Sequence, residues 1–338
     1  MSLRTGFVTI GRNEGERLER CLRAVRAVSD AVVYVDSGST DGSVAFARSL
    51  RVEVVELDPT LPFSMSRGRN AGWRRLLEMH PDLDAIQFLD GDCELIVGWM
   101  EAASEFLIAH PDVSVVCGRR RERFPENSLY NRLCDVEWNS PVGEARSCGG
   151  DALMRVAPLR DSGGFNEELI AGEEPELCLR IREAGGRIWR IDQDMTWHDA
   201  NILSLKQWWK RHVRGGYGAV DVATRCADRS EVLFASQVRS ARRWVIVSVL
   251  LWFASYGFSF VGSYVASMSL KVMILGAWAA QAVRIGLGVR QRCDGDIPLA
   301  LKYGFMTMLA KWPQSIGQWR YWRDRAEKRP TRLIEYKK

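Results

Sequence analysis

The chain has 338 residues, of which 46% are hydrophobic and 26% charged, and it carries a formal net charge of +5. This length fits roughly two domains, and the composition excludes a protein that is disordered over a long stretch. Acidic and basic residues are interleaved through about the first 200 positions, which argues against the clustered Lys and Arg surface of nucleic-acid-binding proteins.

The N-terminal segment and the cysteines bear on the cellular compartment. The sequence MSLRTGFVTIGRNE passes from a short apolar stretch into polar residues, without the apolar segment and small-residue cleavage site of a secretory signal. The eight cysteines form no CxxC pair, and most lie in apolar surroundings. We therefore expect no secretory leader and a reduced, cytosolic setting.

Short β-branched runs alternate with helical patterns from the start of the chain, which predicts βα units, an α/β fold and a mostly parallel sheet with flanking helices. Strands are expected at residues 6–10, 31–36, 52–57, 85–90 and 113–118, and helices at 14–28, 42–50, 66–79 and 98–109. Ligands bind at the carboxyl ends of strands in open α/β sheets, so the site is expected in the loops that follow the strands.

Residues 147–191 follow a second pattern. Two Gly-rich stretches, SCGGDALMR and DSGGFNEEL, are followed by a helix expected from about residue 174 to 184 and by a short strand, RIWRI. We expect this segment to supply the substrate side of a first domain that covers residues 1–200.

Residues 201–240 carry a basic and aromatic segment, QWWKRHVRGGYG, and are expected to form amphipathic linker helices. Residues 241–338 change in composition. Their first apolar run, 244–266, is uncharged and has the roughly 20 residues that a spanning helix needs. The second, 272–288, is shorter and contains Gln281 and Arg284.

These two runs predict a helical hairpin whose connecting loop carries Lys271 as its only charge. Arginines flank the pair on both sides, which places both ends in the cytoplasm by the positive-inside bias. The alternative is a pair of buried helices in a soluble helical subdomain, since an arginine facing lipid costs a few kcal/mol. Residues 297–323 suit either an interfacial helix or an amphipathic helix that packs on protein.

The most informative motif is FLDGDCEL, which places Asp90, Gly91 and Asp92 directly after an expected strand. Two acids separated by one residue at a strand end can hold a divalent cation, and the cation neutralises charge on a diphosphate leaving group. Acid-Gly-acid triplets also occur in ordinary turns, so the motif alone does not decide between the two.

A second acidic motif, YVDSGSTDGS, follows another expected strand. Asp36 at the strand end is interpreted as a ligand-binding carboxylate that can accept hydrogen bonds from a uracil or a ribose. Asp41 stands where a helix opens, and capping of that helix is the favoured interpretation over ligand contact.

Together these motifs resemble the family 2 glycosyltransferases, which have the Rossmann-like GT-A fold of nucleotide-sugar transferases. The resemblance covers about residues 5–200 and rests on several motifs in family order. They are VTIGRNEGERLERCL, VVYVDSGSTDGS, SRGRNAGW, FLDGDCEL, CGGDALMRV, GGFNEEL and GEEPELCLRIREAGG. Such a combination is far more specific than any one motif.

The resemblance implies a role for each matching residue. The residues implied in binding the nucleotide and the donor sugar are Thr9, Asn13, Glu14, Asp36, Arg69, Asn70, Asp90, Gly91, Gly150 and Asp151. Asp92 is implied as a metal ligand, Asp90 as a ligand of the ribose or the metal, and His198 as a third metal ligand. For His198 the alternative is a packed or capping histidine.

The resemblance also implies a catalytic base. GEEPELCLR matches the family's Glu-Asp motif before a helix, and the second acid is Glu174 here where Asp is commoner. An inverting displacement needs a carboxylate within reach of the acceptor hydroxyl, on the face opposite the leaving group. The choice between Glu173 and Glu174 stays open, because acids at a helix start also stabilise the helix dipole.

The expected function is therefore inverting transfer of a sugar from a nucleotide diphosphate donor, with a UDP-sugar as the implied donor and Mg²⁺ or Mn²⁺ as cofactor. A lipid-linked or surface-polysaccharide acceptor and a location at the cytoplasmic face of the cell membrane follow from family habit and from the apolar hairpin. The alternatives are a nucleotide-sugar-binding protein without turnover and a sugar-phosphate nucleotidyltransferase. The latter is disfavoured because the loop GRNEGER is acidic and poor in glycine.

Overall fold

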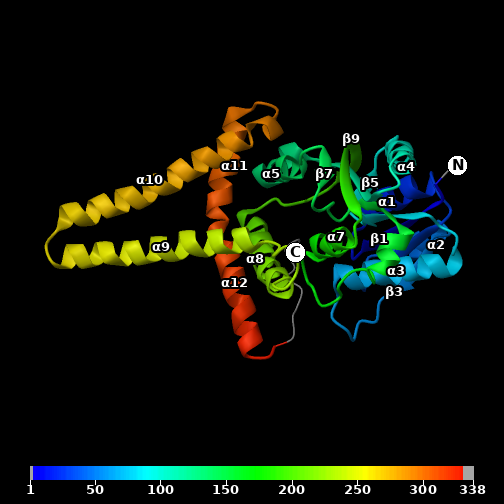
Figure 1. The fold of residues 1–338 in the computed structure, drawn as a ribbon, viewed down its shortest axis with the longest axis horizontal. Helices are drawn as coiled ribbons and strands as arrows, with labels where there is room; N and C mark the ends of the chain where they lie inside the picture. Colours follow the sequence, from blue (N-terminus) through cyan, green and yellow to red (C-terminus); the bar gives the residue numbers. More distant parts are fainter. Residues whose placement is uncertain (1–2, 330–338) are drawn as a thin grey trace. The chain divides into compact units, whose positions relative to one another are not determined.

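The structure is a computed structural model that describes residues 3–329, so the end of the predicted C-terminal region, 330–338, lies outside the described residues. The chain forms two compact units. Within the described residues, the first unit comprises 3–203 and 226–233, and the second comprises 204–225 and 234–329. Figure 1 labels several elements of each unit.

The first unit is built on a nine-stranded mixed sheet with the order β3-β2-β1-β4-β8-β6-β9-β5, and β7 pairs with β9. Its strands are β1 (Thr5–Gly11), β2 (Val32–Asp36), β3 (Glu53–Glu56), β4 (Ala85–Asp90), β5 (Cys93–Leu95), β6 (Val113–Glu122), β7 (Gly143–Ala145), β8 (Ala152–Arg155) and β9 (Arg187–His198). Its helices are α1 (Glu16–Arg26), α2 (Ser43–Ser49), α3 (Met65–Met79), α4 (Trp99–Ala109), α5 (Leu129–Trp138), α6 (Val156–Asp161) and α7 (Glu173–Glu183), with a 3-10 turn at Pro125–Asn127.

Helix α1 shows why the first βα unit forms. Its buried residues Leu18, Cys21, Leu22 and Val25 recur at the three- and four-residue spacing of one helix face. Acidic residues occupy its first turn and arginines its last, so its side chains complement the helix dipole at both ends.

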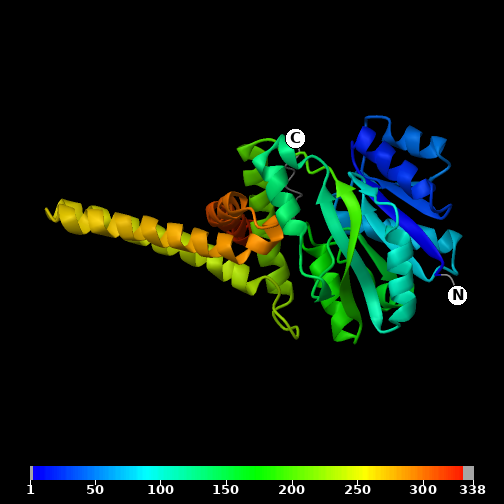
Figure 2. The ribbon, with the colours of Figure 1, turned by 90° about the horizontal axis from the view of Figure 1, so that it is seen from above.

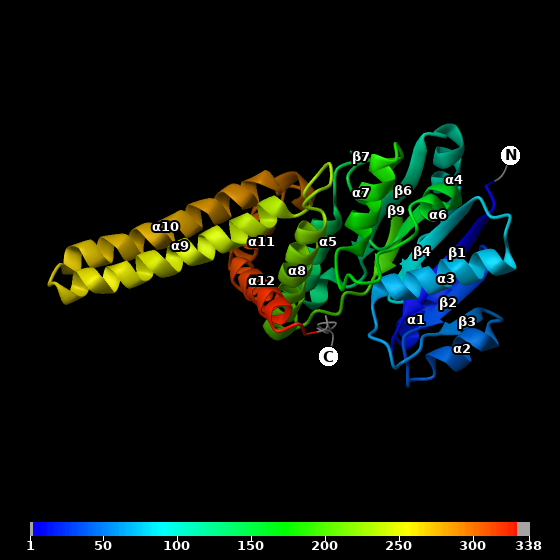
Figure 3. The same ribbon diagram turned by 60° about the horizontal axis from the view of Figure 1, so that its bottom comes forward.

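Helix α3 approaches the parallel strands closely because glycines line its inner face. A Cβ on Gly72 would lie 2.3 Å from the Val8 side chain of β1, and one on Gly68 would lie 3.2 Å from that of Ile10. Figure 3 shows α3 lying across this face of the sheet. Close approach of helix and strands brings the start of α3, which carries Arg69, to the ends of β1 and β4.

The predicted α/β fold is confirmed, and the sheet is parallel only in part. β1, β2, β3 and β4 pair in parallel, as the alternating βα pattern predicts. The second half is mixed, since β8 runs antiparallel to both β4 and β6 while β6 and β9 are parallel. Here the chain uses Gly-rich turns and short strands in place of complete βα units, and antiparallel pairs need no helical crossover.

The second unit is entirely helical over its described residues. Its helices are α8 (Leu205–Arg225), α9 (Ala235–Phe260), α10 (Tyr264–Gly288), α11 (Ile297–Leu309) and α12 (Lys311–Ala326), with a 3-10 turn at Arg290–Cys293. Figures 1 and 2 show α9 and α10 running side by side as a hairpin. Residues 297–323, expected as one helix, form two, α11 and α12. Close glycine contacts pack α12 on α8: a Cβ on Gly317 would lie 2.1 Å from the Val213 carbonyl oxygen.

The predicted position of the hairpin turn is wrong. The turn lies at residues 261–263, and Lys271 lies inside α10. Gly262 adopts a left-handed conformation, with φ of 83°, which ends α9 where apolar composition gave no signal. Within the hairpin the Lys271 ammonium lies 4.9 Å from the ring centre of Tyr256 and 5.7 Å from that of Trp252, so cation–π contacts offset its charge.

Helices α9 and α10 are each long and apolar enough to cross a membrane. Little of either apolar window is buried: 6% in α9 and 17% in α10. Large apolar side chains are exposed along both, including Leu250 at 63%, Phe253 at 69% and Val265 at 81%. The second unit therefore does not bury these helices as a soluble helical core would.

Candidate active site

The carboxyl ends of three parallel strands carry the first group of predicted residues. In the sheet register Gly11 of β1 pairs with Asp36 of β2, and Ile10 pairs with Asp90 of β4. Gly91 follows and donates its N–H to the Ile10 carbonyl over 2.7 Å. Asp36 and Asp90, 54 positions apart in the sequence, thus flank the end of one strand, which is the expected place for a ligand in such a sheet.

Asp36 organises the loop after β2. Its carboxylate accepts hydrogen bonds from the backbone N–H groups of Gly38 (2.8 Å) and Ser39 (2.7 Å) and from the Tyr34 hydroxyl (2.8 Å). The residue is buried, so these bonds replace the water that its charge loses. Burial, with the adjacent Asp36 carboxylate, raises the pKa of Tyr34 above its usual range.

The loop after β1 is tied to the loop after β2. Asn13 has a left-handed backbone, with φ of 54°, and its side-chain oxygen accepts the Thr40 N–H over 2.7 Å. Its own N–H donates to the Ser39 hydroxyl over 2.9 Å. Glu14 pairs with Arg17 at 2.8 Å. The two loops predicted to hold the nucleotide therefore form one connected structure.

Asp41 was predicted to be the N-cap of the second helix, but it lies one residue before the N-cap. Gly42, with φ of 85°, is the N-cap of α2, so the interpretation of Asp41 as the cap itself is corrected. The Asp41 carboxylate accepts the N–H groups of Ser43 (3.1 Å) and Gly15 (2.9 Å). Burial acts to raise the pKa of Asp41, but the hydrogen bonds from Ser43 and Gly15 outweigh it and hold the pKa below its usual value.

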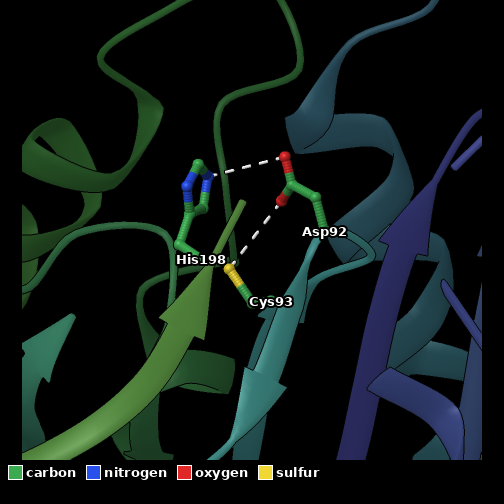
Figure 4. A group of neighbouring side chains, drawn as sticks. All are labelled: Asp92, Cys93 and His198. Carbon is green, nitrogen blue, oxygen red and sulfur yellow. Dashed lines mark hydrogen bonds and ion pairs between the residues drawn. The ribbon is translucent and has the colours of Figure 1, made fainter. Parts of the chain in front are cut away.

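The predicted metal ligands Asp92 and His198 come together across an antiparallel strand pair. Cys93 of β5 pairs with His198 of β9, which turns the histidine ring toward the preceding aspartate. His198 Nε2 lies 3.5 Å from Asp92 Oδ2, and the Cys93 Sγ lies 3.8 Å from the other Asp92 oxygen (Figure 4). Both Asp92 and His198 are buried.

Glu122 lies on the side of the His198 ring that faces away from Asp92. One of its carboxylate oxygens lies 3.8 Å from His198 Nδ1, and the other accepts a hydrogen bond from Asn131 at 3.2 Å. The Trp138 ring meets the histidine ring edge-on at 4.6 Å between centres. The histidine ring is thus bordered on two sides, by Trp138 and by a carboxylate that is close to Nδ1 but beyond hydrogen-bond distance.

These residues fit a divalent cation. Two ligands of one ion, each at roughly 2.1 Å, lie about 3.0–3.4 Å apart, so Asp92 and His198 need little movement to share one. His198 presents Nε2 toward Asp92 while Nδ1, a buried nitrogen, faces Glu122. An oxygen and an imidazole nitrogen suit Mn²⁺ and related ions.

Arg69 joins three predicted residues in one buried network. Its guanidinium pairs with Glu173 at 2.6 Å and with Asp90 at 2.7 Å. A Cβ on Gly150 would lie 2.8 Å from this guanidinium and 2.9 Å from an Asp90 oxygen, so any other residue there would displace the ion pair. Burial alone would lower the pKa of Arg69, but Asp90 and Glu173 outweigh it and raise the pKa, so the charge persists.

A second arginine of this network, the partly buried Arg120, was not predicted. It pairs with Asp151 at 2.9 Å and lies 3.7 Å from Asp90. Asp151 also accepts a hydrogen bond from the Thr196 hydroxyl over 2.9 Å. Burial would lower the pKa of Arg120, but Asp151 outweighs it and raises the pKa. Arg69 and Arg120 therefore both lie beside Asp90, and their positive charges are paired with carboxylates of the same network.

The two candidate bases differ in their contacts. Glu173 is held by the Arg69 ion pair. Glu174 accepts the Cys148 backbone N–H over 2.5 Å and lies 3.1 Å from the Cys178 thiol. Glu174 is thus positioned by neutral donors, and among residues 3–329 no arginine or lysine forms an ion pair with it.

Two predicted residues lie away from this cluster. The Thr9 side chain is fully buried and faces the Cys21 sulfur of α1 at 3.9 Å. The Asn70 side chain binds the loop before α7: it accepts the Phe165 N–H over 2.9 Å and donates to the Phe165 carbonyl and to Glu167. Both residues shape the walls around the site, and their assignment to the nucleotide stays a prediction.

Sequence reasoning missed Arg120, Glu122 and Thr196. All three lie in strands that extend past their predicted ends: β6 continues to Glu122 and β9 to His198. The run RRRE held a usable signal, because strand alternation puts Arg120 and Glu122 on one face and Arg119 and Arg121 on the other. The structure bears this out: Arg119 and Arg121 both pair with Asp135.

Comparisons with known proteins agree with this geometry. Residues 7–150 match the family model described as glycosyl transferase family 2. The match covers β1 through the Gly150 turn and so includes Asp36, Asp90 and Asp92. The N-terminal unit thus contains the segment of the chain that is similar to the family 2 glycosyl transferases.

The proteins that are similar to the chain include two curated relatives and one solved structure. Succinoglycan biosynthesis protein ExoA of Rhizobium meliloti is 27% identical over 222 residues, 61% of this chain and 65% of that protein. A pre-mycofactocin glycosyltransferase of Mycobacterium tuberculosis is 29% identical over 178 residues, 49% of this chain and 37% of that protein. The chain thus matches less than two thirds of the length of either relative.

The solved structure is the mannosyltransferase PcManGT from Pyrobaculum calidifontis in complex with GDP-Man and Mn²⁺. It is 16% identical, with a TM-score of 0.58 over 94% of this chain and 88% of that one. This similarity supports the fold.

Proposed function

We propose that this chain, whose residues 7–150 match the family 2 glycosyl transferase model, is an inverting glycosyltransferase that uses a nucleotide diphosphate sugar and a divalent cation. The observation that carries the proposal is the pairing of Asp92 with His198 beside the Arg69 network. A candidate cation site, the buried Arg69, the partly buried Arg120 and a helix-start carboxylate are groups of the kind that transfer from a diphosphate donor requires.

The donor would lie across the carboxyl ends of β2, β1 and β4. Asp36 would face the nucleobase, and Asp90 the ribose or the metal. Asp92 and His198 would hold Mg²⁺ or Mn²⁺, which neutralises charge on the leaving diphosphate when bound. PcManGT, the structural neighbour, was solved with GDP-Man and Mn²⁺. A UDP-sugar remains the proposed donor of this chain. GDP-sugars are the alternative donors against which it is to be tested.

Glu174 is the proposed base. Its carboxylate would take the proton of the acceptor hydroxyl while that oxygen forms a bond to the anomeric carbon and the bond to the diphosphate breaks. A base must be free to accept a proton, and the Arg69 pair occupies Glu173. The backbone N–H of Cys148 orients Glu174 without supplying a competing charge. Glu173 would then serve to hold Arg69 in place.

The acceptor is proposed to be a lipid-linked or surface glycan at the cytoplasmic face of a membrane. Helices α9 and α10 support membrane attachment, since both are apolar and little of their candidate spans is buried. Arg284, near the C-terminal end of α10, is exposed and can extend its guanidinium toward the interface. ExoA, a relative by sequence, is a succinoglycan biosynthesis protein, in keeping with a polysaccharide product.

Donor hydrolysis tests the proposal. Purified full-length protein is assayed against UDP- and GDP-sugars with and without Mn²⁺, next to Asp92→Ala and Glu174→Gln. We expect metal-dependent release of nucleotide diphosphate from one donor. Glu174→Gln should lower turnover by about 10²–10⁴-fold, the contribution typical of a general base, while donor affinity is kept.

Glu173→Gln is the matched comparison for the base. If it alone loses turnover and Glu174→Gln does not, the base assignment reverses. Release from no donor, with nucleotide binding indifferent to metal and to Asp92→Ala, would instead favour a nucleotide-sugar-binding protein without turnover.

A further inference from the structure

A second group of potential metal ligands lies beside the proposed base. Cys148 precedes the Gly-rich turn at Gly149 and Gly150, and Cys178 lies one helical turn after Glu174 in α7. The two sulfurs are 3.6 Å apart, and the Cys178 sulfur lies 3.1 Å from Glu174 Oε1. One ligand atom from each of the three residues lies within 4.8 Å of the others.

These separations match a tetrahedral metal site. Two thiolates bound to one zinc ion at about 2.3 Å lie about 3.8 Å apart, close to the observed sulfur–sulfur distance of 3.6 Å. A thiolate and a carboxylate oxygen on the same ion lie about 3.5 Å apart, so the Cys178–Glu174 contact needs to open only slightly. A disulfide, by contrast, would need the sulfurs to approach to about 2.05 Å.

The surroundings supply the other requirements of a metal site. Cys148 is only partly buried, which gives an ion access, while Cys178 and Glu174 are buried. The Cys148 N–H already orients the Glu174 carboxylate, as an outer-shell donor does for a ligating acid. Two thiols and one carboxylate favour a soft or borderline ion such as Zn²⁺ over Mg²⁺ or Mn²⁺.

We propose that Cys148, Cys178 and Glu174 form a Zn²⁺ site, separate from the Asp92–His198 site, and that its occupation inhibits sugar transfer. The inhibitory part rests on the proposed function, because a carboxylate bound to zinc cannot take the acceptor proton. Binding replaces two thiol protons by the ion, so it strengthens as the pH rises. The transferase would thus respond to free zinc through its own base.

Metal binding is tested first, without any activity. Co²⁺, a spectroscopic substitute for zinc, is titrated into the reduced full-length protein, and the thiolate-to-cobalt charge-transfer band is recorded before and after Zn²⁺ is added. We expect a band that Zn²⁺ abolishes. Cys148→Ser and Cys178→Ser should lose it, whereas Cys93→Ser, which alters the thiol beside Asp92 and His198, should keep it.

The fold of each variant is checked by circular dichroism. If the buried Cys178→Ser fails to fold, the partly exposed Cys148→Ser carries the test. Absence of a thiolate band in the folded wild type, or a band that only Cys93→Ser removes, overturns the proposal.

Inhibition is measured second, with Mn²⁺ saturating. The zinc concentration that halves nucleotide diphosphate release should rise more than about tenfold in Cys148→Ser, as expected when one of three ligands is lost. Equal zinc sensitivity in Cys148→Ser and wild type would overturn the inhibitory role. A thiolate band in a protein that turns over no donor would leave the zinc site standing and reject the proposed function instead.

Discussion

The two units of this protein break the usual rule of burial in opposite directions. In the first unit charged side chains are buried: Arg69 is 1% exposed, and Glu173 is 4% exposed. In the second unit large apolar side chains are exposed, with Phe260 at 92% and Val265 at 81%. Neither is expected of an ordinary globular domain, in which buried charges and broad apolar surfaces are both rare.

This difference in burial between the two units supports two separate inferences. A buried charge is costly unless a partner compensates for it, so the Arg69 network indicates a site where charge is needed. An exposed apolar surface is costly only in water, so α9 and α10 indicate the medium in which the chain works. Each inference assumes an environment for certain side chains, a buried one in the first unit and an apolar one around α9 and α10. A substitution whose free-energy cost depends on that environment therefore tests it.

The largest effect is expected for Arg69→Ala. Removal of one partner from a buried ion pair leaves an uncompensated charge and typically costs about 3–5 kcal/mol of unfolding free energy. Arg75→Ala is the matched control, since Arg75 pairs with Glu53 and Glu78 but is 42% exposed. For such a surface pair a loss of about 0–1 kcal/mol is expected. The unfolding free energy of both variants is measured by urea denaturation followed by circular dichroism. Equal losses of unfolding free energy would show that burial of the Arg69 ion pairs adds nothing to their contribution to stability.

The next effect concerns the medium around α9. Leu250→Asp puts a charge at an exposed apolar position, and an acid near the centre of a spanning helix costs about 2.5–3.5 kcal/mol. We expect the variant to shift from the membrane pellet to the soluble fraction after carbonate extraction. Val97→Asp, at a position 96% exposed in the first unit, should change neither fractionation nor stability. A Leu250→Asp protein that fractionates as the wild type does would argue against a hairpin inside the bilayer.

The sequence was sufficient for the parts of the site that depend on local pattern. Asp36, Asp90 and Asp92 follow β-branched runs, and parallel pairing places such strand ends side by side. Arg120 and Glu122 could not be found in this way, because tertiary packing sets the strand pairing that brings their partners near: Asp151 directly precedes β8, and His198 ends β9. The choice between Glu173 and Glu174 likewise depended on Arg69, 104 residues away. The hairpin turn escaped because apolar composition continues through Gly262.

A smaller effect tests one of the residues that the sequence did not reveal. Glu122→Gln keeps the size of the side chain and its bond with Asn131 but removes the charge 3.8 Å from His198 Nδ1. Loss of such a supporting carboxylate typically lowers metal affinity about 10–100-fold. Mn²⁺ affinity, read from the metal dependence of donor hydrolysis, should fall within that range. Glu94→Gln, which removes a half-buried acid paired with Arg123, is the control, and an equal fall there would assign the effect to general electrostatics.

The smallest effect on stability is expected for substitution of Asp41, a charged residue of the first unit whose side chain is exposed. Its pKa in the folded protein lies below the ordinary value of 3.8, because the hydrogen bonds from Ser43 and Gly15 outweigh burial. The stability that this carboxylate adds is therefore present above about pH 4 and is lost as the pH falls through the folded value. Asp41→Asn should remove that acid-side loss and cost less than about 1 kcal/mol at neutral pH, since solvent screens the group. Urea midpoints between pH 3 and pH 7 measure it against Asp192→Asn, a 91% exposed carboxylate of β9. If Asp41→Asn lowered the unfolding free energy as much as Arg69→Ala does, burial would not determine how much the loss of a charged side chain destabilises this unit.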